Sequence, residues 1–406
     1  MNYDIILPSQ TTLKSLVATR TLKPYEPIAI EFIEALSQEI LGDMGLRQYP
    51  ELVAMAFWMR LSHLQQMQRH FDNKQGEALW LARGIVFHIT PANVDSIFIY
   101  SWFISLLAGN SNIIRLSSTQ TLQIEALFHI LRNLLERPNF SPIRERTLLV
   151  RYGYDREVTE FFSQVCDLRV IWGGDRTIET IRAVPLKSTA TEIVFADKFS
   201  LAAIRAKAFL SQENKERIIE RFYNDAYWFG QMACSSPKLI IWEGDRSDIK
   251  QAQEVFWLLL EEKVIQKMSD FSISDFSISD QINKLVSSYS LAVCRPVKIC
   301  PSVKNLISRI ELDSLQELET ELHCGSGLFW EYSVTQLGEI FPHLSRKYQT
   351  LAIFGFNRED LLTVLKTSQL VGIDRVVPLG QALIFSTTWD GYDLQREFVR
   401  EIAINF

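Results

Sequence analysis

The run Gly84-Ile-Val-Phe-His-Ile-Thr90 begins the part of the chain that decides its fold. It is short, apolar and β-branched, and Pro91 and Asn93 end it, which is typical of a buried strand. An apolar stretch of helical length follows at 96–108, and a second β-branched run, Asn112-Ile-Ile-Arg-Leu116, comes next. The order of strand, helix and strand predicts the first βαβ unit of a parallel sheet.

The same alternation continues toward the C-terminus. We expect, in order, a helix over 119–137, a strand over 148–152, a helix over 156–165 and a strand over 168–172. Such alternation predicts a parallel sheet covered by helices. The last of these strands runs into Gly173-Gly174, a turn that would let backbone N–H groups approach a phosphate, although glycine is also common in such turns for steric reasons alone.

The flanking regions complete a two-domain prediction. Residues 26–73 carry the spacing of amphipathic helices. After Phe195 the pattern restarts, with helices expected over 213–228, 248–267 and 358–368 and strands over 238–242, 289–294, 305–311, 350–356 and 380–386. A chain of 406 residues is too long for one small core. We therefore expect one domain from residues 1–198 with 376–406 and a second from 199–375.

Composition excludes several classes of protein. The formal charge is −6 and no lysine or arginine block exceeds two residues, which argues against a nucleic-acid partner. The longest apolar run, 97–109, is too short for a membrane span of ~20 residues, and no secretory signal opens the chain. Five cysteines without a CxxC pair or zinc-type histidine spacing predict a reducing, cytoplasmic setting and no metal.

One cysteine stands out by its surroundings. Cys234 lies in Phe229-Gly-Gln-Met-Ala-Cys-Ser-Ser-Pro-Lys238, a polar break between two apolar runs. Polar breaks at strand ends are where enzymes expose nucleophiles, and a thiol there becomes one if neighbouring groups stabilise its thiolate. The alternative is that Cys234 is a small buried hydrophobe, as most free cysteines are.

Five short motifs, in this order, resemble the aldehyde dehydrogenase superfamily. They are Ile89-Thr-Pro-Ala-Asn93, Leu106-Leu-Ala-Gly-Asn110, Ile113-Ile-Arg-Leu-Ser117, Trp172-Gly-Gly174 and Gly230-Gln-Met-Ala-Cys234. Within the superfamily the chain looks like the acyl-CoA reductase family, whose best-known member is the fatty-acid reductase subunit of bacterial luminescence. That narrower likeness is carried from about residue 80 onward by Val170-Ile-Trp-Gly-Gly-Asp175, Cys234-Ser-Ser-Pro-Lys238, Gln349-Thr-Leu351, Gly372-Ile-Asp-Arg-Val-Val-Pro-Leu-Gly380 and Trp389-Asp-Gly-Tyr-Asp393.

The resemblance implies a fold and a reaction. The fold is an aldehyde-dehydrogenase-like α/β architecture, with a Rossmann-type cofactor domain, an α/β catalytic domain and an active site in the cleft between them. The reaction is reduction of a long-chain acyl thioester to the fatty aldehyde. The Cys234 thiolate attacks the acyl carbonyl and displaces the donor thiol, and hydride from a reduced nicotinamide then releases the aldehyde.

The same resemblance assigns roles to named residues. Asn93 would supply a side-chain amide to the carbonyl oxygen as it gains negative charge, a donor of a kind worth ~3–4 kcal/mol. The residues expected to bind the cofactor are Thr90, Pro91, Arg115, Gly173 and Gly174. The Arg115 guanidinium would also hold a 2′-phosphate, which favours NADPH over NADH.

Two departures from the superfamily pattern bear on the chemistry. The motif Gly-Gln-x-Cys is one residue longer here, so Gln231 takes no role from the family. The acidic Glu-Leu-Gly-Gly-Lys segment, whose glutamate activates water in aldehyde-oxidising members, is absent before Cys234. Its loss suits an enzyme that keeps a thioester away from water, although Asp197 or Glu192 could replace it.

Partners and rival functions stay open at this point. The donor is an acyl-CoA or an acyl-protein thioester, and the resemblance adds an acyl-activating synthetase as a protein partner; a homo-oligomer is also compatible with the sequence. One rival is a cysteine acyltransferase or thioesterase that uses Cys234 without hydride. Another is a non-catalytic partner of the synthetase. Neither His88, expected in the core, nor His323, beside Cys324 and expected on a strand, is assigned to the site.

Overall fold

The computed structural model describes residues 3–76, 78–91, 97–117, 121–270, 278–300 and 305–404. Its internal contacts divide the chain into two compact units. Unit 1 contains Met1–Asp197 and Phe385–Phe406, and unit 2 contains Lys198–Ile384. The sequence-based division at 198/199 and 375/376 differs at its second boundary, because the segment after residue 375 remains attached to unit 2 as far as Ile384.

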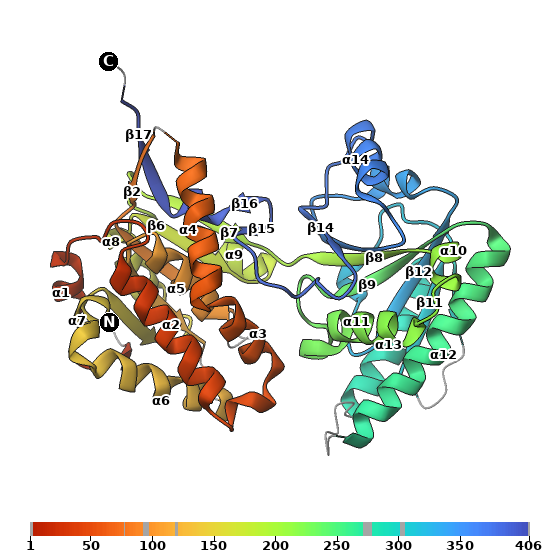
Figure 1. Ribbon diagram of the computed structural model, residues 1–406, viewed down its shortest axis with the longest axis horizontal. Coiled ribbons are helices and arrows are strands. Elements are labelled where there is room, and N and C mark those ends of the chain that lie inside the picture. The colour runs from red at the N-terminus through yellow and green to blue at the C-terminus, as the bar shows by residue number, and fades with distance from the viewer. Residues whose placement is uncertain are drawn as a thin grey trace. The chain divides into compact units, whose positions relative to one another are not determined.

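Unit 1 is built on a six-stranded sheet in the order β1-β5-β4-β3-β6-β7 (Figure 1). The strands are β1 (Asp4–Leu7), β3 (Ile85–Ile89), β4 (Ser111–Leu116), β5 (Thr147–Arg151), β6 (Leu168–Trp172) and β7 (Thr191–Phe195). All neighbours pair in parallel except β1 with β5. The chain proceeds outward from β3 to β5 and then returns to place β6 on the other side of β3. The carboxyl ends of β3 and β6 therefore form a topological switch point.

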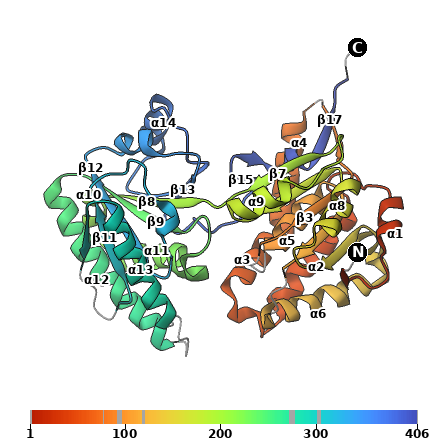
Figure 2. The ribbon, with the colours of Figure 1, turned by 180° about the vertical axis from the view of Figure 1, so that it is seen from behind.

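Helices cover both faces of this sheet, as views from opposite sides show (Figures 1 and 2). On one face α5 (Ile97–Leu107) packs on β3 and β4, with α2 (Pro27–Gly42) against α5 and α6 (Leu122–Glu136) against α2. On the other, a core cluster joins strand residues such as Phe87 and Ile89 to α1, α8 and α9. These three helices are α1 (Leu13–Ala18), α8 (Arg156–Val165) and α9 (Asp175–Arg182).

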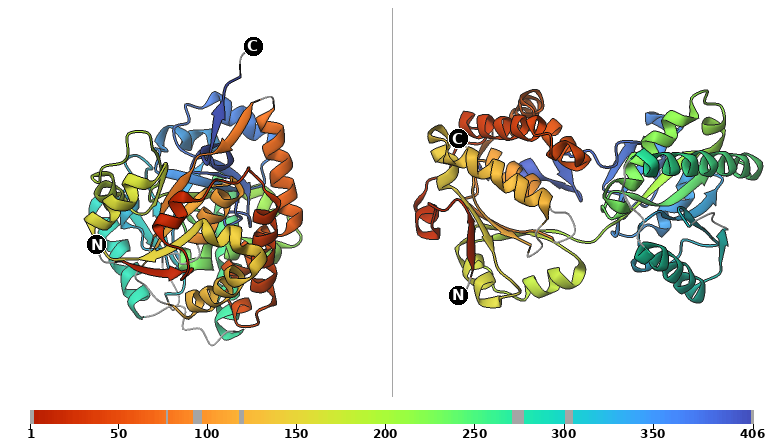
Figure 3. Two further views of the ribbon diagram at one scale, coloured as in Figure 1. Left: turned by 90° about the vertical axis from the view of Figure 1, so that its left-hand side faces the viewer. Right: turned by 90° about the horizontal axis from the view of Figure 1, so that it is seen from below.

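The remaining elements of unit 1 lie around this sheet and its covering helices. They are η1 (Leu46–Gln48), α3 (Pro50–Trp58), α4 (Leu61–Gln75), β2 (Leu79–Ala82), η2 (Pro138–Phe140), α7 (Ser141–Glu145), β15 (Thr388–Trp389), β16 (Tyr392–Asp393), α15 (Leu394–Glu397) and β17 (Val399–Ile402). The C-terminal strand β17 pairs antiparallel with β2, so the tail returns to the unit that holds the N-terminal helices (Figure 3).

Unit 2 contains a seven-stranded sheet in the order β10-β11-β12-β9-β8-β13-β14. Its strands are β8 (Phe199–Arg205), β9 (Pro237–Glu243), β10 (Val297–Cys300), β11 (Ser308–Leu312), β12 (Leu328–Val334), β13 (Tyr348–Phe354) and β14 (Arg375–Pro378). Only the edge strand β10 is antiparallel to its neighbour. The pairing of β8 with both β9 and β13 matters most for function, because the segments at the amino ends of these three strands meet around Cys234.

The two faces of the second sheet are also covered by helices. A core cluster joins alternate residues of β8, β9 and β12 to α10 (Ala206–Leu210), α11 (Lys215–Tyr227) and α12 (Arg246–Asp270). The other strand face packs against η5 (Leu337–His343), α14 (Arg358–Thr367) and one buried leucine of α13 (Ile278–Cys294). Two short helices, η3 (Trp228–Gln231) and η4 (Thr320–Leu322), lie in loops. Within the described ranges, no helix combines the length and apolar character needed to cross a bilayer.

The structure confirms the alternation predicted from Gly84 to Trp172 and corrects two later elements. Residues 289–294 belong to helix α13 and are not a strand. Residues 380–386 form no strand either, because their backbone groups bind side chains instead: Arg375 donates to the carbonyls of Ala382 and Ile384, and Asp225 accepts from Gly380 and Ala382.

Candidate active site

Cys234 is a partly exposed residue in a tight turn that links η3 to β9. Phe229, Gly230 and Gln231 adopt successive left-handed conformations with φ of 58°, 58° and 64°. Such conformations are unfavourable for residues other than glycine and persist only where surrounding contacts hold them. The chain reaches Cys234 through a strained backbone, which is common at functional sites.

Gln231 supplies the contacts that hold this backbone. Its side chain is fully buried. The amide nitrogen donates to the carbonyls of Pro237 (3.0 Å) and Leu328 (2.9 Å), and its oxygen accepts from the N–H of Gly327 (2.9 Å). Gln231 therefore ties the turn to the segment before β12, and its role is structural.

Two further strands fix the backbone of Cys234 itself. The Ser200 hydroxyl on β8 donates to the Cys234 carbonyl (2.6 Å) and accepts from the N–H of Thr350 on β13 (3.1 Å). The side-chain nitrogen of Gln349, also on β13, lies 3.5 Å from the Cys234 sulfur and donates to it. The Cys234 turn thus rests on the amino ends of β8 and β13.

The other cysteines differ from Cys234 in their burial or in the effect of burial on their thiols. Burial raises the pKa of Cys166 to about 12 and that of Cys300 to about 11, and it also raises the pKa of Cys324. A thiol in such surroundings is a poor nucleophile. Cys294 is exposed near the end of α13. Within the described ranges, no group of three His, Cys, Asp or Glu side chains is placed to hold a metal ion.

His88 and Glu192 are both engaged in contacts within unit 1. His88 is buried in β3, bonded to Ser101 (2.7 Å) and Asn112 (3.0 Å), and burial lowers its pKa to about 4, which confirms it as a core residue. His323 lies in a loop after η4 rather than on a strand. Glu192 forms ion pairs with Arg169 (2.6 Å) and Arg182 (2.9 Å), so its carboxylate is already engaged.

In unit 1, the predicted cofactor residues gather at the carboxyl ends of the strands. Thr90 and Pro91 follow β3, and Gly173 and Gly174 follow β6, its direct neighbour in the sheet. The Gly173 N–H donates to the Phe195 carbonyl (3.1 Å), so this amide is already used within the fold. A side chain at Gly174 would meet open space, which leaves the start of α9 accessible.

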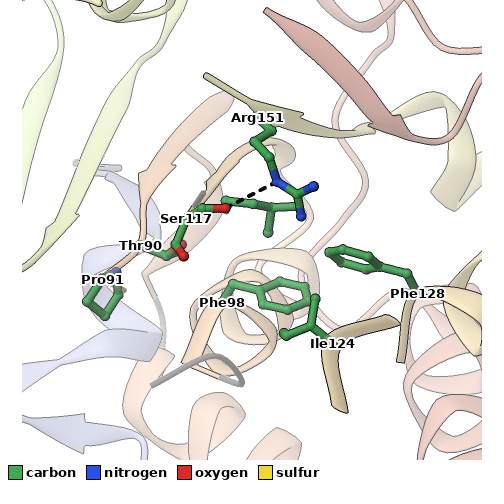
Figure 4. Close-up of a pocket in the computed structure, with 8 residues that line it drawn as sticks. Thr90, Pro91, Phe98, Ser117, Ile124, Phe128 and Arg151 are labelled. Carbon is green, nitrogen blue, oxygen red and sulfur yellow. Dashed lines mark hydrogen bonds between the residues drawn. The ribbon is translucent and has the colours of Figure 1, made fainter. Parts of the chain in front are cut away.

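A pocket opens beside the end of β3 on the α5 and α6 side of the sheet (Figure 4). The described residues that line it are Thr90, Pro91, Phe98, Leu116, Ser117, Ile124, Phe128 and Arg151. The Arg151 side chain donates from Nε to the Ser117 carbonyl (3.2 Å), as the dashed line in Figure 4 shows. One guanidinium and two phenylalanine rings thus face a small space at the strand ends.

Arg115 lies near the carboxyl end of β4, where its carbonyl accepts from the Thr90 hydroxyl (2.8 Å), but its side chain lies on the other face of the sheet. It has the same orientation in β4 as Ile113, which packs toward α8 and α9. Its guanidinium donates to the carbonyls of Tyr152 and Gly153 (both 3.4 Å) and lies near the rings of Tyr152 and Tyr154. The structure does not bring Arg115 into the pocket that Thr90 and Pro91 line.

The fold of this chain is also found in solved structures of other proteins. In solved structures the same fold occurs in aldehyde dehydrogenase 21 from Physcomitrella patens (TM-score 0.63, 11% identity, 96% of this chain and 86% of that one). It also occurs in glyceraldehyde-3-phosphate dehydrogenase GapN from Methanocaldococcus jannaschii, complexed with NADP (0.62, 13%, 93% and 88%), and in lactaldehyde dehydrogenase from Escherichia coli (0.60, 12%, 96% and 88%). The protein therefore has the aldehyde dehydrogenase fold.

The family is narrower than the fold. The model of the acyl-CoA reductase (LuxC) family matches residues 56–269, more than half of the chain and including Cys234. The chain belongs to this family of aldehyde-related oxidoreductases. No curated protein sequence matches it.

Sequence analysis and structure differ over which residues surround the sulfur. Asn93 lies outside the described residues, so its predicted role stays a prediction. The sequence does not indicate a role for Gln349 or Ser200, although Gln349-Thr-Leu351 is part of the family likeness. Only the pairing of β8 with β13 brings Ser200, Gln349 and Thr350 to the cysteine turn, and no local pattern in the sequence signals it.

Proposed function

We propose that the protein reduces long-chain acyl thioesters to fatty aldehydes with NADPH, through an acyl-enzyme on Cys234. The observation that carries the proposal is the partly exposed residue Cys234, on a strained turn with its sulfur beside an amide donor, in a member of the acyl-CoA reductase family. The buried cysteines with raised pKa are poor alternatives to it.

Each step draws on residues of this chain. The Cys234 thiolate attacks the acyl carbonyl, the C–S bond to the donor thiol breaks, and the donor leaves as a thiol. The contacts of Gln231, Ser200 and Thr350 fix the direction of attack by immobilising the cysteine backbone. The Asn93 amide is proposed to stabilise the carbonyl oxygen as it gains negative charge.

NADPH supplies the hydride that converts the thioester to the aldehyde oxidation level. Two parts of unit 1 suit a nucleotide. One is the pocket at Thr90 and Pro91. The other is the surface at Arg115, whose buried Nε finds no hydrogen-bond acceptor among the described residues, next to the largely exposed ring of Tyr154. We assign the 2′-phosphate to Arg115 and the approach of the nicotinamide end to Gly174.

Protection of the thioester from water distinguishes a reductase from a hydrolase. The glutamate that activates water in aldehyde-oxidising members is missing here, and the Glu192 carboxylate is held in two ion pairs. Both features support protection of the thioester from water. An acyl-CoA is the proposed donor. An acyl-protein thioester delivered by an acyl-activating synthetase remains the second proposal, and assembly with such a synthetase would go with it.

The test is the intact mass of the protein after incubation with myristoyl-CoA. We expect a gain of one myristoyl group on Cys234 that is discharged as myristaldehyde when NADPH is added. Cys234→Ser should lose NADPH oxidation by at least about 10³-fold, because an alkoxide is far harder to form than a thiolate. Cys166→Ser is the matched control and should keep the label.

Other outcomes identify the rival functions. Discharge to myristic acid without NADPH would show a thioesterase, and transfer to an added thiol or amine would show an acyltransferase. If Cys234 is not acylated and NADPH is not oxidised, the remaining hypothesis is that the protein is a non-catalytic partner of the synthetase.

A further inference from the structure

We propose that the side-chain amide of Gln349 is the hydrogen-bond donor that stabilises the Cys234 thiolate, both when it attacks the acyl group and when it leaves. The inference rests on the proposed function in one respect, the use of Cys234 as nucleophile, and it adds a residue that neither the resemblance nor the superfamily motifs assign.

The contact is built into the sheet of unit 2. The Gln349 nitrogen lies 3.5 Å from the Cys234 sulfur, a distance suited to a hydrogen bond with sulfur, and the Gln349 residue is only 2% exposed. Few conformations are open to a side chain so enclosed. The amide is therefore held near the sulfur before any substrate arrives.

The orientation of the amide is set by its neighbour. The Thr350 hydroxyl donates to the Gln349 side-chain oxygen (3.3 Å), so the nitrogen end faces the sulfur. Backbone contacts fix the strand here: the N–H groups of Ile373 and Asp374 donate to the carbonyls of Tyr348 and Gln349 (2.9 and 2.8 Å). The pairing register of β13 with β8 is irregular between Tyr348 and Leu351, at the position of Gln349.

A neutral amide is chemically suited to this place. A donor to the charged form of a thiol favours the thiolate. Unlike a carboxylate or a neutral imidazole, the amide cannot take a proton from water, so it does not promote hydrolysis of the thioester. As the C–S bond to the acyl group forms, the sulfur loses its charge. When the aldehyde is released, that bond breaks, the electron pair returns to sulfur, and the Gln349 donor stabilises it again.

The test measures the sulfur directly, without substrate or cofactor. The rate at which iodoacetamide alkylates Cys234 is followed against pH by peptide mass spectrometry in the full-length protein. For Gln349→Leu we expect the midpoint of the profile to move up by about one pH unit, the size expected for a lost donor to a charged group. For Gln349→Glu the shift should be larger, because a carboxylate repels the thiolate.

Controls separate this role from a packing role. Thr350→Val keeps Gln349 but removes the contact that orients it, so a smaller upward shift is expected and the proposal stays testable if a Gln349 variant misfolds. Gln253→Leu removes another amide of unit 2, one that donates to Glu331 (3.0 Å), and should leave the midpoint unchanged. Thermal unfolding of every variant reports its folding.

The outcomes distinguish this inference from the proposed function. Folded Gln349→Leu and Gln349→Glu proteins with the wild-type midpoint would overturn the role of Gln349, even if the enzyme reduces acyl-CoA. Shifted midpoints in a protein that never oxidises NADPH would support the donor and overturn the reductase.

Discussion

Gln231 is fully buried and uses both ends of its side-chain amide: the nitrogen donates to the Pro237 carbonyl after Cys234, and the oxygen accepts from the Gly327 N–H before β12. Gln349 also points its amide at this turn, but toward the sulfur. At the scale of single residues, the site is therefore served by two glutamines with different functions. The first maintains the shape of the turn, and we propose that the second sets the charge of the thiol.

Replacing Gln231 tests the structural half of this division. Gln231→Leu removes the hydrogen bonds that this side chain makes to two carbonyls and one N–H, so the free energy of unfolding should fall by about 3 kcal/mol. Urea unfolding at neutral pH measures the change. Gln251→Leu, at an exposed position of α12, serves for comparison and should cost less than about 1 kcal/mol. Equal stability of Gln231→Leu and wild type would contradict the assignment.

At the scale of elements, the cysteine turn is held by a second loop at residues 323–328. The Ser326 N–H donates to the Gly230 carbonyl (3.0 Å). Gly325 has a φ of +74°, and a Cβ there would lie 2.8 Å from the Met232 sulfur and 3.1 Å from the Gly230 carbonyl oxygen. Only glycine allows so close an approach in this conformation. The two loops therefore form one unit that fixes the nucleophile.

Gly325→Ala tests the fit of the two loops. The added methyl group should push the turn away from its position, lowering both the free energy of unfolding by about 1–2 kcal/mol and the rate of Cys234 acylation. Gly338→Ala in η5 is the matched control, because its Cβ would meet only Val364, at an ordinary 3.6 Å. Unchanged acylation in a folded Gly325→Ala protein would show that the turn is positioned by other contacts.

A second pairing of elements should make stability depend on pH. Asp225 on α11 accepts from the N–H groups of Gly380 (2.6 Å) and Ala382 (2.9 Å), with Arg375 nearby, and burial raises its pKa to about 7 from an ordinary 3.8. Between about pH 4 and 7 the folded state keeps a proton that the unfolded state releases. The free energy of unfolding should therefore fall as pH rises through this range, by up to about 1.4 kcal/mol per unit.

The contribution of Asp225 is isolated by comparison with Asp225→Asn. Urea unfolding at pH 5, 6 and 7 should show a steeper decline in wild type than in the variant, since asparagine does not titrate. Parallel pH dependence in the two proteins would mean that the carboxylate is already charged in the folded state at pH 5.

At the scale of the whole molecule, unit 2 is a continuous segment placed between two parts of unit 1. The alternation of strands and helices predicts two domains, because the pattern restarts after Phe195. The boundary near residue 384 was harder to place, since Asp225 is more than 150 residues away in sequence from the amides it binds. The site shows the same limit: Cys234 was identified from its local surroundings, whereas Gln349 reaches it only through the sheet. Helix α13 was mistaken for a strand at 289–294, a window too short to show helical spacing.

Because the proposed cofactor residues belong to unit 1 and Cys234 to unit 2, NADPH should stabilise the two units unequally. Calorimetry of the full chain should show two transitions, with saturating NADPH raising that of unit 1 by about 5–10 °C. Exposure of the buried Cys300 to alkylation identifies the transition of unit 2. The same shift should appear in Cys234→Ala. A shift confined to the transition that exposes Cys300 would place the cofactor in unit 2.

The intrinsic fluorescence of Trp172 should report cofactor binding. Its indole stacks on Phe195 with ring centroids 3.7 Å apart, donates to the Ser101 hydroxyl, and immediately precedes Gly173. A rigid tryptophan emits in the wavelength range that reduced nicotinamides absorb. Binding of the cofactor at the end of β6 should therefore quench the fluorescence of Trp172 more than that of the other tryptophans. A titration of Trp172→Phe should then show less quenching than a titration of the wild type, and the difference would locate the nucleotide near β6.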